Sequence, residues 1–353
     1  MNTIIYRRIG TAIASVLIFS SGFCLQNAVI RGTLPTQNYQ IVKKIPLGGE
    51  GGWDYLTLDS AARRLYITRS TRVTVLNVDT GLVVGEIPHT AGVHGVAIAP
   101  ELSRGFISNG KAATATIFDL KTLQVIGRVK TGSNPDAIVY DPMSQKVFAF
   151  NGKSNSATVF DAKTTKVLGT VGLGGKPEFA VADGFGQIYV NLEDKSEVIT
   201  LNTSSLKVQR HWALKPCSEP TGIAIDRQHR RLFIGCGNQV MSVADANTGS
   251  IKATLPIGNG TDAIAYDPAT GLAFSSNGEG SLTVVHEDSP DKFSIVNNVV
   301  TQRGARTMAL DLKTHKLYLD TAKFQATPTS ITGQPRSRPS IIPGTFVILV
   351  LGD

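Results

Sequence analysis

Residues 134–142, NPDAIVYDP, and residues 260–268, GTDAIAYDP, are nearly the same phrase written twice in one chain. Weaker copies open five further segments, and successive copies begin 40, 42, 42, 43, 41 and 44 residues apart. The first residues of the seven copies are Asp54, His94, Asp136, Glu178, Thr221, Asp262 and Arg306. A period near 40 residues is typical of propellers and solenoids.

The short apolar runs inside each repeat favour strands over helices. The opening phrase is followed by a run such as KVFAF (146–150), then by runs such as ATVFDA (157–162) and KVLGTVGLG (166–174). These runs are rich in β-branched residues and are separated by turns containing Gly or Asp. A helical solenoid needs apolar residues three and four apart, and that spacing is missing beyond the N-terminal segment. The sequence therefore predicts an all-β fold, a seven-bladed β-propeller.

The seventh segment is one strand short. It has an opening phrase at Arg306, a second strand at 316–320 and a last strand at 345–352, after which the chain ends. Residues 39–48, YQIVKKIPLG, are similar to the fourth strand of the other segments. We therefore expect the N-terminal strand to complete the last blade, so that the ring has no free edge. The propeller domain would span residues 39–353.

Residues 1–28 have the layout of a secretory signal peptide. Arg7 and Arg8 precede an apolar run at 9–19 and small residues at 20–22. A retained membrane anchor is one alternative, although the run is short for a bilayer span of ~20 residues. Lipid attachment at Cys24 is another. We expect cleavage, a periplasmic or secreted protein, and no membrane span after cleavage.

The charge distribution limits the choice of partner. The formal net charge is +8, and charged residues make up 18% of the chain. No run of Lys and Arg and no basic stripe interleaved with aromatic residues is present, so nucleic acid is not an expected partner. The expected partner is a small polar ligand or a protein of the cell envelope, and the chain is expected to be a monomer.

Cys217 and Cys236 are the only cysteines after Cys24. The first precedes the fifth opening phrase and the second ends the next strand, so two antiparallel strands would bring them to one edge of a blade. Exported proteins fold in an oxidising compartment. We expect a disulfide, with two free thiols as the alternative.

The repeats resemble the YVTN-type repeats of the YncE-like family of exported seven-bladed propellers. The words NPDAIVYDP, KVFAFNG, ATVFDAKTTKVLGTV and GGKPEFAVAD carry the resemblance, which covers residues 39–353. It implies export and a scaffold that binds a ligand or partner. It implies no shared set of catalytic residues.

Propeller geometry predicts where the non-repeating residues meet. The innermost strands line a central channel, and the loops leading into them share a face with the loops between the second and third strands. The seven opening residues should therefore surround one mouth of the channel. Asn-Gly turns after the second strands would add Asn109, Asn151 and Asn277, although tight-turn formation is the alternative explanation for them. Both rings are candidate ligand-binding residues.

A divalent metal is a further candidate at this mouth. Carboxylate and amide oxygens suit Ca²⁺ or Mg²⁺, whereas a histidine at position 94 suits zinc. The candidate ligands are Asp136, Glu178, Asp262 and Glu50. The last of these lies in GEGGWD (49–54), which is faintly similar to the opening of lactonase-type six-bladed propellers, where a Glu binds metal. The alternative is that the carboxylates only pair with neighbouring Arg and Lys side chains.

No cofactor is predicted beyond this candidate metal. The sequence contains no HExxH, GxSxG, CxxCH or phosphate-loop motif. We therefore expect a binding or scaffold protein, with a metal-assisted, lactonase-like hydrolase as the alternative. The proline-containing stretch 322–344 replaces a short loop of the other blades, and it is either a tolerated insertion or a segment that folds over the mouth as a lid or partner-docking arm.

Overall fold

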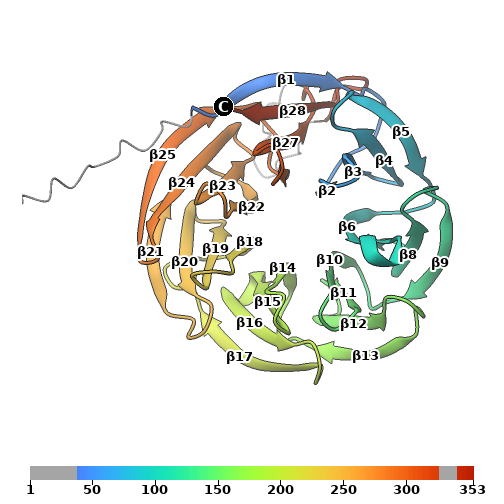
Figure 1. The fold of residues 1–353 in the computed structure, drawn as a ribbon, viewed down its shortest axis with the longest axis horizontal. Helices are drawn as coiled ribbons and strands as arrows, with labels where there is room; N and C mark the ends of the chain where they lie inside the picture. The colour runs from blue at the N-terminus through green and yellow to red at the C-terminus, as the bar shows by residue number, and fades with distance from the viewer. Residues whose placement is uncertain (1–37, 326–339) are drawn as a thin grey trace, which may run out of the picture. The chain divides into compact units, whose positions relative to one another are not determined.

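The computed structural model describes residues 38–325 and 340–353. Within these residues the chain forms seven four-stranded antiparallel sheets arranged as blades around a ring (Figure 1). The predicted all-β, seven-bladed β-propeller is confirmed. No helix in these two ranges is long and apolar enough to cross a membrane.

The blades follow one another in chain order, and within each blade the strands run from the channel outward. Blade 1 consists of β2 (Leu56–Asp59), β3 (Arg64–Arg69), β4 (Arg72–Asn77) and β5 (Leu82–Ile87). Blade 2 consists of β6 (Val93–Ala99), β7 (Arg104–Asn109), β8 (Thr114–Asp119) and β9 (Val125–Lys130). Blade 3 consists of β10 (Pro135–Asp141), β11 (Lys146–Asn151), β12 (Ser156–Asp161) and β13 (Val167–Gly172).

The next three blades have the same order of strands. Blade 4 consists of β14 (Pro177–Ala182), β15 (Gln187–Leu192), β16 (Glu197–Asn202) and β17 (Lys207–Ala213). Blade 5 consists of β18 (Pro220–Asp226), β19 (Arg231–Cys236), β20 (Val240–Asp245) and β21 (Ile251–Pro256). Blade 6 consists of β22 (Thr261–Asp267), β23 (Leu272–Asn277), β24 (Ser281–Ser289) and β25 (Lys292–Val300).

Blade 7 joins the two ends of the propeller. It consists of β26 (Met308–Asp311), β27 (Lys316–Thr321), β28 (Val347–Gly352) and β1 (Gln40–Pro46). The antiparallel register of β1 and β28 runs from Gln40 opposite Gly352 to Pro46 opposite Val347. The predicted closure by the N-terminal strand is confirmed, and it leaves no unpaired edge at the junction of the chain ends (Figure 1).

The core is built from positions that recur in every blade. The third residue of each second strand is a buried aromatic residue, and the residue opposite it on the third strand is also buried. The aromatic residues are Tyr66, Phe106, Phe148, Tyr189, Phe233, Phe274 and Tyr318. Their opposite residues are Val75, Ile117, Val159, Thr200, Val243, Val284 and Val350. Repetition of these two positions makes seven similar sheets that pack face to face.

The turn between the third and fourth strands also repeats. In blades 2, 3 and 5 the last Asp of the third strand, Asp119, Asp161 or Asp245, accepts hydrogen bonds from the backbone N–H groups two and three residues later. Such side-chain to backbone bonds stabilise tight turns. In all three blades a Thr stands three residues after this Asp, and the turn explains that recurring spacing.

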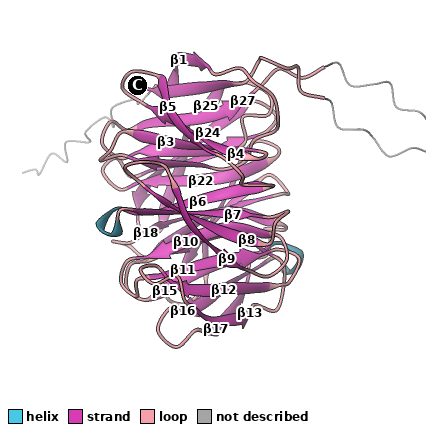
Figure 2. Cartoon of the chain, turned by 90° about the vertical axis from the view of Figure 1, so that its right-hand side faces the viewer, coloured by secondary structure: helices cyan, strands magenta, loops and turns pink. Residues whose placement is uncertain are grey.

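Two short 3-10 helices, η1 (Pro100–Leu102) and η2 (Glu193–Lys195), lie on opposite faces of the ring (Figure 2). The second belongs to the face that carries the predicted channel mouth, because it follows the second strand of blade 4. Two sequence-based expectations fall outside the described residues: the signal peptide at 1–28 with Cys24, and residues 326–339 of the long loop.

Candidate functional site

Five of the seven opening residues form one network of charged groups at the channel mouth. Nδ1 of His94 lies 2.6 Å from Oδ2 of Asp54 and 3.6 Å from Oδ1 of Asp136. The guanidinium of Arg306 lies 3.2 Å from Oδ2 of Asp262 and 3.8 Å from Oδ1 of Asp54. The network thus joins blades 1, 2 and 3 to blades 6 and 7, at the other end of the chain.

Glu178 extends the acidic rim into blade 4. Its Oε2 lies 3.3 Å from Nζ of Lys176, which also contacts Glu193 of η2. Thr221 of blade 5 is different, because its hydroxyl donates to the carbonyl oxygen of Thr261 at 3.1 Å. Thr221 carries no charge, and its hydroxyl already has a backbone acceptor. Blade 5 therefore adds no charged opening residue to the network.

Burial raises the pKa of three carboxyl groups at the mouth, those of Asp136, Glu178 and Asp262. The pKa of Asp136 is raised to about 7, because burial outweighs the attraction of His94 and the charges of Asp54 and Asp262 oppose ionisation. The pKa of Glu178 is also raised to about 7, by burial first and by Asp136 second, against the attraction of Lys176. These groups therefore carry protons at a pH where exposed carboxyl groups carry none.

The same causes act on two further groups. Burial raises the pKa of Asp262 although the charge of Arg306 opposes that shift. Burial alone would lower the pKa of His94, but its hydrogen bond to Asp54 and the charge of Asp136 outweigh burial and raise it. The two neighbouring carboxyl groups thus favour the protonated form of His94.

Two aromatic rings from opposite sides of the channel meet beside this network. Tyr55 of blade 1 and Phe179 of blade 4 lie with their ring centroids 4.5 Å apart, although their blades are not neighbours. The equivalent residues of the other blades are smaller: Gly95, Ala137, Gly222, Ala263 and Thr307. The two rings therefore meet across the channel, and comparison of the repeats column by column would have found them.

The hydroxyl of Tyr55 lacks a hydrogen-bond partner among the described residues, although Tyr55 is only 5% exposed. Its pKa is raised well above the usual value, by burial first and then by the charges of Asp262, Glu178, Asp54 and Asp136. A buried polar group without a partner costs free energy unless a ligand or water supplies one. The pair of rings thus offers an unused polar atom near four carboxyl groups.

The cluster of possible metal ligands in the structure differs from the predicted set of Glu50, Asp136, Glu178 and Asp262, and only Asp136 belongs to both. Ligand atoms of Asp54, His94 and Asp136 all lie within 4.8 Å of one another. Glu178 and Asp262 are outside that cluster, although they share the mouth. Glu50 is exposed, and its backbone carbonyl accepts a hydrogen bond from Arg69. Its predicted place among the metal ligands therefore has no support in the geometry.

The predicted second ring of ligand residues does not face the mouth. Asn109, Asn151 and Asn277 are at most 1% exposed. Each side-chain amide donates to two hydroxyl groups on the adjoining third strand, for example to those of Thr114 and Thr116 in blade 2. These asparagines stabilise the turn between the second and third strands, and their amides are not available to a ligand in the channel.

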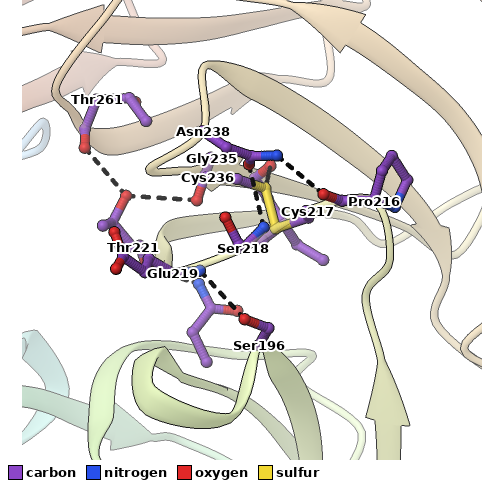
Figure 3. The surroundings of a disulfide bond; sticks show 12 residues. Ser196, Pro216, Cys217, Ser218, Glu219, Thr221, Gly235, Cys236, Asn238 and Thr261 are labelled. Atoms are coloured by element: carbon purple, nitrogen blue, oxygen red, sulfur yellow. Dashed lines mark hydrogen bonds between the residues drawn. A yellow bond between two sulfur atoms is a disulfide. The ribbon is translucent and has the colours of Figure 1, made fainter.

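Cys217 and Cys236 form a disulfide in the structure (Figure 3). It ties the loop leading into β18 to the end of β19, and both cysteines are buried. Asn238 strengthens the same corner, since its side chain donates to the carbonyl of Pro216 and accepts from the N–H of Ser218. The leading loop of blade 5 is therefore fixed covalently and by hydrogen bonds next to the mouth.

Comparison with known proteins supports the fold and goes no further. No protein-family model matches the sequence, and no curated protein matches it either. Among solved structures, hydrazine synthase from Kuenenia stuttgartiensis is similar, with a TM-score of 0.68 and 15% sequence identity over 84% of this chain and 96% of that chain. At this identity the similarity shows a shared β-propeller fold, and function has to be argued from the site.

Proposed function

We propose that this propeller is an exported binding protein whose channel mouth takes a small cationic ligand. The observation that carries the proposal is the convergence of Asp54, Asp136, Glu178 and Asp262 around the unpartnered hydroxyl of Tyr55. Each carboxylate side chain is only 12–17% exposed. Such recessed groups are reached more easily by a small ligand than by the flat surface of a partner protein.

Burial and the charges of neighbouring carboxylates disfavour ionisation of Asp136 and Glu178, and a bound cation would relieve both. It would replace lost hydration with direct oxygen contacts, and it would screen the repulsion between neighbouring carboxylates. Because Asp136 and Glu178 have pKa values of about 7, binding at neutral pH would displace protons from them. The affinity for a cation should therefore increase as the pH rises through 7.

Two features support the location outside the cytoplasm. The disulfide between Cys217 and Cys236 is typical of exported proteins. The basic, apolar and small residues at 1–28 follow the order of a signal peptide. The resemblance to the exported YncE-like propellers agrees with both, and we propose a periplasmic or secreted monomer.

A metal-assisted hydrolase is the second candidate, and the cluster of Asp54, His94 and Asp136 favours it. Carboxylate oxygens and imidazole nitrogens both bind zinc, and a bound metal could polarise a carbonyl or activate water. The same three residues would then hold the metal, and Glu178 lies near enough to Asp136 for the charge of Asp136 to raise the pKa of Glu178.

Calorimetric titration of the chelator-treated protein with Zn²⁺, Ca²⁺ or putrescine tests the proposal. We expect saturable binding of at least one of these cations, weakened at least ~10-fold in Asp136→Asn, because a charged contact is lost. Glu197→Gln is a matched control. The carboxylate of Glu197 lies 2.9 Å from Nδ1 of His211 and takes no part in the mouth network. Binding of Zn²⁺ alone, with ester or lactone hydrolysis, would favour the hydrolase, and no binding of any cation would refute both.

A further inference from the structure

A second recess lies between blades 4 and 5, away from the mouth network. It is a groove of about 200 Å³. Residues of β15, β16 and β17 line it, together with Arg230 just before β19 and the residues that follow β20. From blade 4 it receives Thr200, Arg210 and Trp212, and from blade 5 it receives Arg230 and Asn247. None of these residues belongs to the charged network of the mouth.

Three residues of this groove depart from the repeat. Thr200 occupies the position opposite the buried aromatic residue, where the other six blades have Val or Ile. Arg210 lies opposite Thr200 on the outer strand, where blades 1, 2 and 3 have Gly85, Gly127 and Gly169. Trp212 replaces an aliphatic residue of the other blades. The equivalent aliphatic residues are Ile87, Val129, Val171, Leu255, Val299 and Ile45.

Two polar atoms in the groove lack a hydrogen-bond partner within residues 38–325 and 340–353. Thr200 is only 4% exposed, yet its Oγ1 has no partner. Oε1 of Gln187 is also buried and unpartnered, while its amide nitrogen donates to Gln209 at 2.8 Å. Valine would fill the place of Thr200 without burying an unpaired hydroxyl, as it does in the neighbouring blades. The hydroxyl and the amide oxygen are therefore available to a ligand.

The charges around the groove are only partly neutralised. Arg230 is held by Asp183 at 3.0 Å, by the hydroxyl of Tyr189 and by Asn247. Arg210 is exposed and makes no ion pair within the part of the chain that the structure describes. A ligand in the groove thus meets an acceptor at Gln187, a hydroxyl at Thr200 that can donate and accept, and a free guanidinium.

We propose that the groove binds a single sugar ring, with preference for one that carries a carboxylate. Hydroxyl groups of a sugar can donate to the amide oxygen of Gln187 and can pair with the hydroxyl of Thr200. A carboxylate on the ring would be recognised by Arg210 through charge-assisted hydrogen bonds. The volume of about 200 Å³ is below the ~300 Å³ of sites for drug-sized ligands, which limits the occupant to one ring.

Tryptophan fluorescence gives a direct test, because Trp212 lines the groove and the other tryptophan, Trp53, packs against Phe324 and Phe346. The full chain is titrated with methyl β-D-glucuronide and, separately, with methyl β-D-glucoside. We expect saturable changes with both and tighter binding of the glucuronide. Trp212→Leu, which introduces the residue of blade 5, should abolish the change.

Two variants locate the binding chemistry. Thr200→Val, which restores the residue of blades 1, 3, 5, 6 and 7, should keep the melting temperature and weaken binding of both sugars at least ~10-fold. Arg210→Ala should remove the preference for the glucuronide while the glucoside still binds. Arg128→Ala, which removes an exposed arginine from the outer strand of blade 2, is the control and should bind as the parent chain does.

The outcomes are decisive in both directions. The loss of binding in a normally folded Thr200→Val protein supports the proposal. Absence of saturation with both sugars, or unchanged affinity in Thr200→Val, overturns it. An unchanged preference for the glucuronide in Arg210→Ala would overturn the assigned role of the guanidinium.

Discussion

The interior of the blades and the channel mouth are built from the same repeat, but the interior positions are similar in all seven copies and the mouth positions differ. Inside the blades the same kind of residue recurs seven times, as with the aromatic column that includes Phe148. At the mouth, the opening residues of the repeats supply Asp, His, Glu, Thr and Arg to one ring. Repetition therefore accounts for architecture, while chemistry depends on positions that differ from blade to blade.

The largest loss of stability is expected in blade 7, where the two chain ends close the ring. A chain that begins at Leu47 lacks β1 and should lose cooperative unfolding, because β28 becomes a free edge and the burial of Tyr39 and Ile45 is lost. Burial of two such side chains contributes about 3–6 kcal/mol. Circular dichroism during heating measures the effect, and a chain that begins at Asn38 is the control. Normal unfolding of the shorter chain would contradict the closure argument.

The next largest effect is expected in the aromatic column. Phe148→Ala removes a fully buried ring between blades and should lower the free energy of unfolding by about 3–5 kcal/mol. Denaturant titration measures this loss. Phe185→Ala, at a 69% exposed ring, is the matched control and should change the free energy by less than about 0.5 kcal/mol.

A somewhat smaller effect is expected at the disulfide. Replacement of Cys217 and Cys236 by Ser together opens a loop with a sequence separation of 19 and should lower the free energy of unfolding by about 3 kcal/mol. Denaturant titration in oxidising buffer gives the value. Addition of a reductant to the parent protein should produce a similar loss, and no loss in either case would contradict a stabilising role.

The effect expected at the mouth has the opposite sign, and it is the smallest of the four when it is counted per pH unit. A carboxyl group whose pKa is raised by folding stabilises the fold below its unfolded pKa and loses that contribution as the pH rises through its folded pKa. Asp136 has a folded pKa of about 7. Asp136→Asn should therefore gain stability relative to the parent as the pH rises from about 4 to about 7, by at most about 1.4 kcal/mol per pH unit, and the difference should level off above pH 7.

Melting temperatures of the two proteins across that pH range provide the measurement. Other ionisable groups surround position 136, so the stability advantage of Asp136→Asn is expected to grow gradually with pH. These groups are His94, Asp54, Glu178 and Lys176. A constant difference between the two proteins at all pH values would show that Asp136 does not change protonation in this range.

The fold could be predicted because it is repeated, and the site could be predicted only in part. Closure by residues 39–48 followed from counting strands, and convergence of the opening residues followed from propeller geometry. The side chain of Asn109 was expected at the mouth, but the hydroxyl groups of the adjoining strand draw it into the blade. Glu50 was chosen by similarity to another kind of propeller, and its loop leaves it exposed.

Other site residues were missed because their role becomes clear only when equivalent positions of the blades are aligned. Tyr55 and Phe179 look like ordinary strand residues until their columns are compared with Gly95 and Ala137, which shows that two large rings must share the channel. Thr200 is an ordinary strand residue in isolation. Its departure becomes visible only when strand pairing places it opposite Tyr189, in a column otherwise filled by Val and Ile.

Proton counting during cation binding tests the central claim most directly. The parent protein is titrated calorimetrically at pH 7 with the cation that binds best, in buffers with different enthalpies of ionisation. Since Asp136 and Glu178 have pKa values of about 7, we predict a net release of protons, which is reduced in Asp136→Asn. Binding without proton release, or with the same release in Asp136→Asn, would contradict the assignment of the mouth as the cation site.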